Sequence, residues 1–364
     1  MSNTRKTVMA GLTPGQKKNR RQVANWLYLV VSLLLVSLLV GGITRLTDSG
    51  LSITEWKPLV GIIPPIGEAQ WLEEFAKYQQ IAQYKHLKYG MTPGEYKFIF
   101  WWEWGHRLLT RIVLVIFTAL PLMFFWITGK LERQVKWRLL GTLALGGLQG
   151  GVGWWMVSSG VGDSDLLYVS SYRLALHLIL ACLLIVSGLT LARRLESCQT
   201  PPASHGAHVF AGWLIFLILV QIYLGALVAG IRAGSDFNTW PLMNEAWIPA
   251  GLFDLQPWWH NFFENTMTVQ FVHRSFAWFL IVITAVHAFW LQRRFPGTAH
   301  VFRAMLLLVL MLLQAMIGVA TLLLAVPLNW GVFHQGFALV VLCYAVIHWV
   351  SCKGTLPVPS ESKH

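Results

Sequence analysis

Charged residues are scarce in this 364-residue chain, at 12%, and acidic residues are the scarcest, with 16 Asp and Glu against 28 Lys and Arg. Hydrophobic residues make up 55% and include 19 tryptophans. This composition excludes an ordinary soluble domain, whose surface needs far more charge. The sequence therefore predicts an integral membrane protein.

Cysteine is also rare, with four in the whole chain. Cys182 and Cys343 fall within apolar stretches, and Cys198 and Cys352 fall where the chain is predicted to reach the inner surface. None of them is placed to form a disulfide in an oxidising outer compartment. We expect no chemical role for the thiols.

Long apolar stretches, in contrast, are abundant. A helix needs about 20 mostly apolar residues to cross a bilayer. Eight stretches approach or exceed this length, at 26–43, 98–128, 139–157, 174–192, 209–231, 269–291, 304–326 and 330–350. The predicted fold class is an all-α membrane protein with eight transmembrane helices. The long connection 44–97 is expected to pack as short helices over the outer side.

Basic residues predict the orientation in the membrane. Of the 28 Lys and Arg, 17 fall before the first stretch, in connections from an even to an odd stretch, or in the tail. Since positively charged segments stay on the cytoplasmic side, both termini are predicted to be cytoplasmic. The short amino terminus favours a bacterial plasma membrane over the mitochondrial inner membrane. The positive charge is thus a topology signal, and no nucleic-acid partner is expected.

Four histidines occupy matching depths. His106, His177, His273 and His334 lie in the second, fourth, sixth and eighth stretches, each within about ten residues of the start, or no more than about 15 Å deep. Alternate helices run in the same direction, so all four lie toward the outer surface. Two imidazoles from facing helices can ligate a haem iron, and this predicts one haem in each half. A simple hydrogen bond at the interface is the alternative for any single histidine.

An internal repeat supports the pairing. The third, fifth and seventh stretches share Gln-x-x-x-Gly, and the first and fifth end alike at 39–43 and 227–231, each followed by an arginine, Arg45 or Arg232. The repeat predicts two duplicated four-helix bundles related by a pseudo-two-fold axis along the membrane normal. The expected division is a basic amino terminus 1–25, a first half 26–194, an inner linker 195–208, a second half 209–351 and a tail 352–364.

Charged residues beside the histidines suggest unequal roles for the two sites. Arg107 and Arg274 follow His106 and His273 directly, and with Arg45 and Arg232 they are candidates to bind haem propionates. Glu103 lies one helical turn before His106, and the matching residue in the second half is the neutral Gln270. A carboxyl group beside only one porphyrin could act as an acid or base, or stabilise positive charge. Its alternative role is an ion pair with Arg107 or Lys97.

Several motifs resemble those of the haem A synthase family. They are the run Gly-Gly-Ile-Thr-Arg-Leu-Thr-Asp-Ser-Gly-Leu-Ser at 41–52, Thr-Glu-Trp-Lys-Pro at 54–58, Glu-Trp-Gly-His-Arg at 103–107, and the four histidines. The resemblance implies oxidation of the C8 methyl group of haem O to a formyl group, giving haem A for terminal oxidases. It also implies that the chain is of the type without a cysteine pair in an outer loop.

The resemblance further assigns roles to residues. His106 and His177 would hold the substrate haem in the first half, His273 and His334 would ligate haem b in the second half, and Glu103 would be the catalytic carboxyl group. The expected partners are haem O, the lipid bilayer, and either haem O synthase or oxidase assembly factors. A homo-oligomer is compatible with the sequence.

Three alternatives belong to other functional classes. A membrane cytochrome b that only transfers electrons would need the histidines alone, and His287 and His348, fourteen residues beyond two proposed ligands, raise the question of a third haem. A transporter would need interrupted helices and a polar site at mid-membrane, which the third to eighth stretches lack. Farnesyl transfer to haem would need acidic clusters for magnesium diphosphate, and Asp163 with Asp165 is too little.

Overall fold

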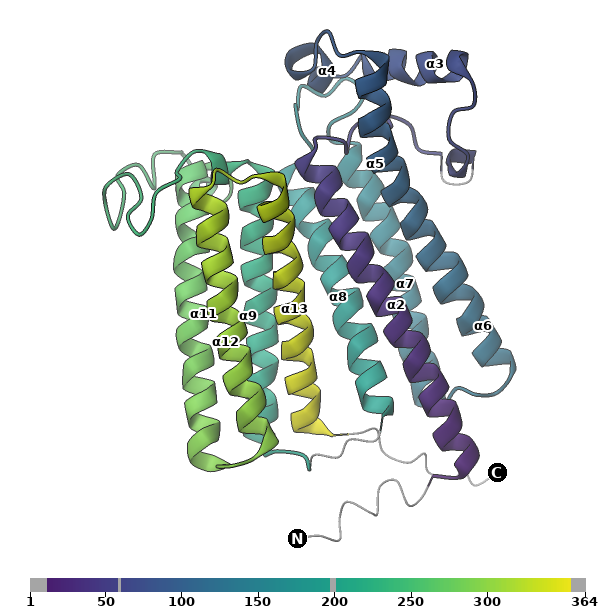
Figure 1. Ribbon diagram of the computed structural model, residues 1–364, viewed down its shortest axis with the longest axis vertical. Coiled ribbons are helices and arrows are strands. Elements are labelled where there is room, and N and C mark those ends of the chain that lie inside the picture. The colour runs from purple at the N-terminus through teal and green to yellow at the C-terminus, as the bar shows by residue number, and fades with distance from the viewer. Residues whose placement is uncertain (1–11, 58–59, 197–200, 355–364) are drawn as a thin grey trace.

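The computed structural model describes residues 12–57, 60–196 and 201–354. Over these residues the chain is helical apart from turns, connections and one isolated β-bridge between Met243 and Ala246. Eight long helical rods of the described chain run side by side (Figure 1). They are α2 (Pro14–Leu46), α5 (Pro93–Ile112) continued by η2 (Val113–Ala119) and α6 (Leu120–Ile127), α7 (Arg133–Val157), α8 (Ser171–Leu195), α9 (His205–Gly230), α11 (Thr266–Arg294), α12 (Ala299–Leu323) and α13 (Leu328–Lys353).

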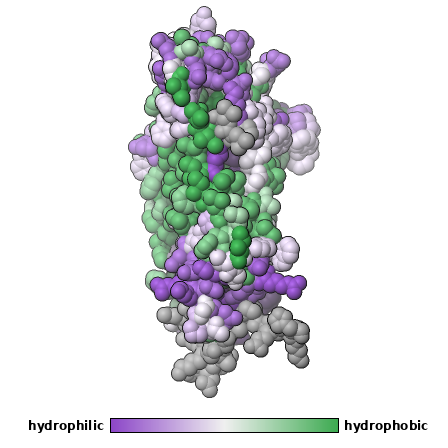
Figure 2. Space-filling view, turned by 90° about the vertical axis from the view of Figure 1, so that its right-hand side faces the viewer, coloured by the Kyte–Doolittle hydropathy of each residue, from purple (hydrophilic) through white to green (hydrophobic). Residues whose placement is uncertain are grey.

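Seven of these rods are long and apolar enough to cross a membrane, so the chain is a multi-pass membrane protein. The rod outside this group is α7, the third predicted span. Figure 2 shows the matching surface, an apolar belt between two hydrophilic ends. The start of α2 and the end of α13 lie at one end of the rods, and the loop helices lie at the other (Figure 1).

Helix ends extend beyond the predicted spans because polar residues cap them. Thr13 and Gln16 form a capping box around Pro14, so α2 begins twelve residues before the predicted start at 26. Thr92 and Glu95 do the same for α5. The amino-terminal turns of α2 are further held by Arg20, which pairs with Glu132 just before α7. The predicted boundary between 25 and 26 therefore falls inside a continuous helix.

The long outer connection folds as predicted into short helices above the first half. These are η1 (Val60–Ile62), α3 (Glu68–Tyr78) and α4 (Ala82–Leu87). Figure 1 shows α3 and α4 on either side of the start of α5. Phe75, Tyr78 and Tyr84 from this layer pack with Tyr96 and Phe100 at the start of α5. The connection over the second half is mostly irregular, with the short helices η3 (Ala233–Ser235), η4 (Trp258–His260) and α10 (Asn261–Glu264).

A proline interrupts the second rod. Pro121 has no N–H to bond the carbonyl of Phe117, and its ring crowds that carbonyl. The helix widens into the π-helix η2 just before it, and the indole Nε1 of Trp26 on α2 donates to the Phe117 carbonyl at 2.6 Å. By the spacing from His106 and His273, the matching residue of α11 is Ala288, and α11 is uninterrupted.

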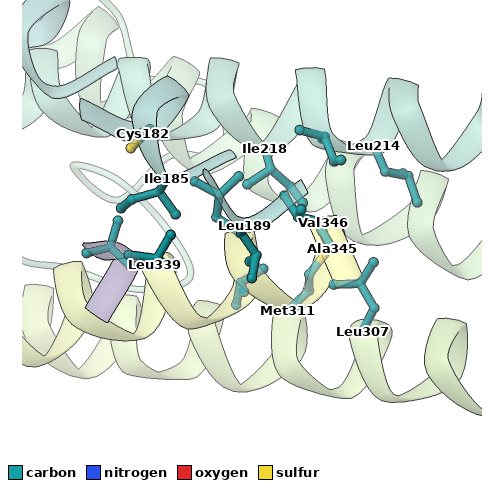
Figure 3. Packing of buried hydrophobic residues seen from close by; sticks show 14 of the residues in the cluster. Cys182, Ile185, Leu189, Leu214, Ile218, Leu307, Met311, Leu339, Ala345 and Val346 are labelled. Atoms are coloured by element: carbon teal, nitrogen blue, oxygen red, sulfur yellow. The ribbon is translucent and has the colours of Figure 1, made fainter. Parts of the chain in front are cut away.

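The two halves share one hydrophobic core. Figure 3 shows Ile185 of α8 facing Leu339 of α13 in a cluster that also contains side chains of α9 and α12, and the same cluster includes Val31 and Leu38 of α2. Helix α13 packs against both α2 and α8, and α8 packs against α9. Cys182, Cys343 and Cys352 are free thiols, as expected, and Cys198 lies outside the described residues.

Candidate functional site

Each of the four predicted histidine ligands packs its ring against a glycine of the preceding rod. A Cβ added to any of these glycines would lie 2.8 to 3.0 Å from the ring atom Cε1, closer than real Cβ atoms approach a neighbour. The pairs are Gly41 with His106, Gly153 with His177, Gly225 with His273, and Gly318 with His334. The repeated glycine therefore makes room for an imidazole, in addition to the close helix approach that such glycines commonly allow.

A glutamine one turn before the glycine supports the same histidine in three of the four cases. The Nε2 atoms of Gln149, Gln221 and Gln314 donate to the backbone carbonyls of their histidines at 3.0 to 3.1 Å. They also lie 3.1 to 3.4 Å from a ring nitrogen. In the fourth case Ser37 stands at this position, and its hydroxyl donates to the Leu33 carbonyl of its own helix. The Gln-x-x-x-Gly repeat does not include the first stretch, although Ser37-x-x-x-Gly41 has the same spacing.

The structure brings the four histidines together as two pairs. His106 and His177 lie near each other and line one cavity. His273 lies near His334. These are the pairs expected from the repeat, and their role in holding haem stays a prediction.

The cavity beside His106 and His177 has a volume of about 530 Å³ and is enclosed mainly by the first four rods. Pockets of this size accept ligands as large as drugs and cofactors. Charged residues line the part beneath the connection 44–97, namely Arg45, Asp48, Lys57, Glu103, Arg107 and Arg111. Its inner part is lined by apolar side chains and glycines. The cavity is therefore suited to an amphipathic ligand.

Glu103 is buried in the wall of this cavity. Its Oε2 accepts hydrogen bonds from the Ser52 hydroxyl at 2.7 Å and from the Ile53 backbone N–H at 2.8 Å. Its Oε1 accepts one from Arg107 Nη2 at 2.5 Å. The guanidinium of Arg107 also donates to the carbonyls of Ile53 and Glu55. The ion pair with Arg107 considered above is thus present, whereas Lys97 lies over the Trp71 ring.

The second half has the same arrangement, but the amide of Gln270 replaces the carboxylate of Glu103 and donates hydrogen bonds where the carboxylate accepts them. Gln270 Nε2 donates to the carbonyls of Ala233 and Phe237 at 2.7 and 3.2 Å. Arg274 donates to the carbonyls of Phe237 and Thr239 at 2.8 and 3.0 Å. Both residue pairs therefore fix the chain that follows the first rod of their half. The carboxylate accepts from this chain, whereas the amide donates to it.

Arg45 and Arg232 take part in an ion-pair network between the halves. Arg232 pairs with Asp48, Arg45 Nη1 lies 3.8 Å from Asp48 Oδ1, and Arg45 also donates to the carbonyl of Ala229. Both guanidinium groups lie over the ring of Tyr168. Arg45 lines the cavity. Asp48 of the chain itself thus supplies an anion for these two arginines, which were candidates to bind haem propionates.

The match between Arg45 and Arg232 inferred from the similar helix ends is wrong. The glycine contacts align Gly41 with Gly225, which aligns Asp48 with Arg232. These two residues follow their helices in the same left-handed conformation, with φ of 55° and 58°. In this register the similar runs of small residues at 39–43 and 227–231 are offset by one helical turn. Their similarity therefore does not mark equivalent positions of the two helices. The ion pair of Asp48 with Arg232 therefore joins equivalent points of the two halves.

His287 and His348 come together, but as a hydrogen-bonded pair. Their Nε2 atoms are 2.9 Å apart, and both rings are fully buried. Two imidazole nitrogens that bind a haem iron from opposite faces are separated by about 4 Å, given iron–nitrogen bonds of about 2 Å. The pair has no space for an iron between its nitrogens, and this geometry removes the support for a third haem.

Gln335 is a cavity residue that the sequence patterns did not single out. It directly follows His334 on α13, yet it lines the cavity of the first half. Its Nε2 donates to the Leu38 carbonyl on α2 at 2.9 Å, and its side chain lies against Gly42. A residue of the second half thus completes the wall of the first-half site.

The outer layer over the cavity carries its own charges. Lys57, which lines the cavity, lies 2.6 Å from Glu55 and lowers the pKa of that carboxyl group, with help from Lys77. Burial raises the pKa of Tyr78, whose hydroxyl donates to Gln83 at 2.9 Å. Gln83 reaches the cavity wall. The layer is therefore tied together by ion pairs and hydrogen bonds directly above the site.

Comparison with known proteins covers nearly the whole chain. Residues 24–346 match the COX15-CtaA family, described as cytochrome oxidase assembly protein. Proteins named Heme A synthase from Brucella ovis and Brucella suis biovar 1 are 53% identical over 342 residues, covering 94% of this chain and 95% of theirs. Another from Brucella anthropi is 53% identical over 339 residues, 93% of this chain and 94% of its own. The chain belongs to the COX15-CtaA family. The matched range 24–346 contains both histidine pairs, their glycines and Glu103.

Proposed function

We propose that this protein is a haem A synthase, which oxidises the C8 methyl group of haem O to a formyl group in the cavity between His106 and His177. The family and the 53% identity to proteins of that name support the reaction over simple electron transfer. The observation that carries the location is the cavity itself, which has two glycine-seated histidines and a buried carboxylate in its wall. The product is haem A, for cytochrome oxidase assembly.

The residues present fit a haem. Gly41 and Gly153 leave room for the rings of His106 and His177 where any Cβ would collide with them. The Nδ1 atoms of these two rings are buried and have no partner within the described part of the chain. His106 and His177 would hold the haem iron through their imidazole nitrogens, which are the usual protein ligands of haem.

We propose that His273 and His334 hold haem b in the second half. Their seats at Gly225 and Gly318 and their contacts with Gln221 and Gln314 support this role. A bound haem b would supply a site that accepts electrons close to the substrate. The chain's own contribution is to fix the two imidazoles and to separate the cofactor from the reacting carbon.

Glu103 is proposed to act on the reacting methyl carbon. Oxidation withdraws electrons from this carbon, and a fixed carboxylate nearby stabilises the positive charge that develops or accepts a proton from the carbon. Ser52, Ile53 and Arg107 hold the carboxylate in one orientation, so little reorganisation is needed during the reaction. Arg107 and Arg274 use some of their N–H groups to bond loop carbonyls, so a haem propionate would bind their remaining N–H groups. One such group is Nε of Arg274, which is buried without a partner among the described residues.

We also propose how the rods are arranged in the membrane. We infer eight spans, with α7 as the third, in two duplicated halves related by a pseudo-two-fold axis along the membrane normal. The repeated contacts of histidine, glycine and glutamine support the duplication. The proposed division is a cytoplasmic amino terminus 1–25, a substrate half 26–194, an inner linker 195–208, a haem b half 209–351 and a cytoplasmic tail 352–364.

The proposed location and partners follow from this arrangement. Both termini face the cytoplasm of a bacterium, with the protein in the plasma membrane and both haem sites near its outer face. The partners are haem O and the proteins that deliver it or receive haem A, namely haem O synthase and oxidase assembly factors.

The test is the variant Glu103→Gln, with Gln270→Glu as its matched partner in the second half. We expect Glu103→Gln to retain haem O but to lower haem A formation about a hundredfold or more. Gln270→Glu should leave the ratio of haem A to haem O close to that of the unmodified protein. Chromatography of extracted haems measures both. Normal haem A output from Glu103→Gln would refute the catalytic role.

A further inference from the structure

We propose that the inner part of the first-half cavity is a subsite for the farnesyl chain of haem O, through which the protein distinguishes haem O from haem B. This inference rests on the proposed function. Haem O differs from haem B in carrying a long isoprenoid chain, so a site selective for it needs a hydrocarbon channel next to the macrocycle. The cavity has such a channel on the cytoplasmic side of the histidines.

The channel extends well beyond the histidines. All four rods of the first half contribute residues to the cavity on the inner side of His106 and His177, among them Val30, Leu34, Leu114, Leu143, Ala181 and Leu184. Leu184 lies seven residues beyond His177 along α8, or ~10 Å deeper, and Val30 lies eleven residues from Gly41 along α2, or ~16 Å deeper. A macrocycle held between the histidines would not reach this depth, whereas a flexible side chain attached to it would.

The few hydroxyl groups in the channel are already bonded. Thr118 Oγ1 donates to the Val113 carbonyl at 2.8 Å. Thr142 Oγ1 bonds the Arg138 carbonyl and the Ser187 hydroxyl at 2.9 and 2.7 Å. Gln149, next to His177, is the last lining residue with a free polar atom, its Oε1 being buried without a partner among the described residues. Deeper than Gln149, a polar ligand group would lose its hydrogen bonds to water without replacement. The channel therefore favours hydrocarbon, in contrast to the charged outer part of the cavity.

Two features of the first half create the space. Gly146 and Gly147 of α7 line the channel with backbone, and a Cβ at Gly147 would meet nothing within 4 Å. On the opposite wall, the π-helix caused by Pro121 supplies Val113, Leu114 and Thr118. The second half has a regular α11 in place of η2. The wider wall belongs to the half that must admit a larger ligand.

The test is the variant Gly147→Leu, which would place an isobutyl group in the channel. Its matched control is Gly141→Leu, the same substitution on the same helix, where a Cβ also meets nothing and the residue does not line the cavity. Full-length protein in detergent is equilibrated with equal amounts of haem O and haem B, repurified and extracted. The retained haems are quantified by chromatography, with haem A counted as haem O. A His106→Ala/His177→Ala variant, which lacks the first-half histidines, measures how much haem the second half binds.

We expect the first half of the unmodified protein and of Gly141→Leu to prefer haem O by about tenfold or more, because an apolar pocket gains on the order of tenfold from even one added methylene. Gly147→Leu should reduce the preference to near unity while haem B is retained as before, which also reports correct folding. If it loses haem B as well, Leu114→Phe fills the channel from the opposite wall and should abolish the preference.

An unchanged preference in both channel variants would overturn the subsite, as would a first half that retains both haems equally in the unmodified protein. A first half that retains neither haem would overturn the proposed function itself, so the two failures are distinguishable.

Discussion

The two halves of the molecule share one frame and differ at a few positions within it. Both seat two imidazoles on glycines, and both tie an outer connection to the helix that carries the first histidine of the half. Three of the differences are Ser37 in place of a glutamine, Glu103 in place of Gln270, and Pro121 in place of Ala288. They give the first half a carboxylate, a histidine without a supporting glutamine and a π-helix.

The largest effect that separates the halves should come from removing the histidines. His273→Ala/His334→Ala should abolish haem retention in the second half, because no axial ligand remains there. His106→Ala/His177→Ala should do the same in the first half only. Haem content per chain, from pyridine haemochrome spectra, measures both. If either double variant lost the haem of both halves while remaining folded, the two sites would not be independent.

The glycine seats should come next in magnitude. Gly153→Ala and Gly318→Ala each place a Cβ 2.8 Å from a ring carbon. Overpacking of this kind costs about 1 to 3 kcal/mol, so we expect haem affinity of the affected half to fall by about 5-fold to 150-fold. Gly141→Ala, whose Cβ meets nothing, is the control and should leave affinity unchanged. Equal losses in the control would mean that helix backbone effects, and not the seats, are responsible.

The glutamines should have a smaller effect, confined to the histidines they support. Gln221→Ser removes the hydrogen bond to the His273 carbonyl, a contribution of about 0.5 to 1.5 kcal/mol. Haem dissociation from the second half should therefore accelerate by about 2-fold to 13-fold in stopped-flow exchange. Ser37→Ala should have no such effect on the first half, since the Ser37 hydroxyl bonds Leu33 within its own helix. Faster haem loss in Ser37→Ala would show that the serine supports His106 after all.

The smallest effect should be at the ion pair between the halves. Asp48→Asn removes the charge that pairs with Arg232, and both side chains are partly exposed. Such pairs contribute at most about 1 kcal/mol. We expect a slightly lower thermal midpoint that becomes indistinguishable from that of the unmodified protein at high salt, because salt screens the pair. A large, salt-independent loss would mean that this contact holds the halves together.

The paired histidines and the long rods could be predicted from sequence because both depend on strong local patterns. Helix α7 is predicted as a span, but it lies outside the group of rods that are long and apolar enough to cross a membrane. Its six glycines, several of which line the cavity, lower its hydropathy below that of the other rods. Gln335 could not be found by any repeat, since its contact with Leu38 joins segments 297 residues apart. The π-helix had a readable signal in Pro121, whose missing N–H must release one carbonyl.

The glycine-lined wall of α7 has a consequence for the thermodynamics of binding. Side chains that must adopt one rotamer around a ligand lose entropy, at about 0.5 to 1.5 kcal/mol for each one immobilised. Backbone atoms at Gly146, Gly147 and Gly150 have no side-chain rotamers to lose, and their helix is already ordered by packing against α8. On this side of the cavity, only the ligand would have to be ordered. A large and flexible molecule could then be held firmly by a wall that does not move to meet it.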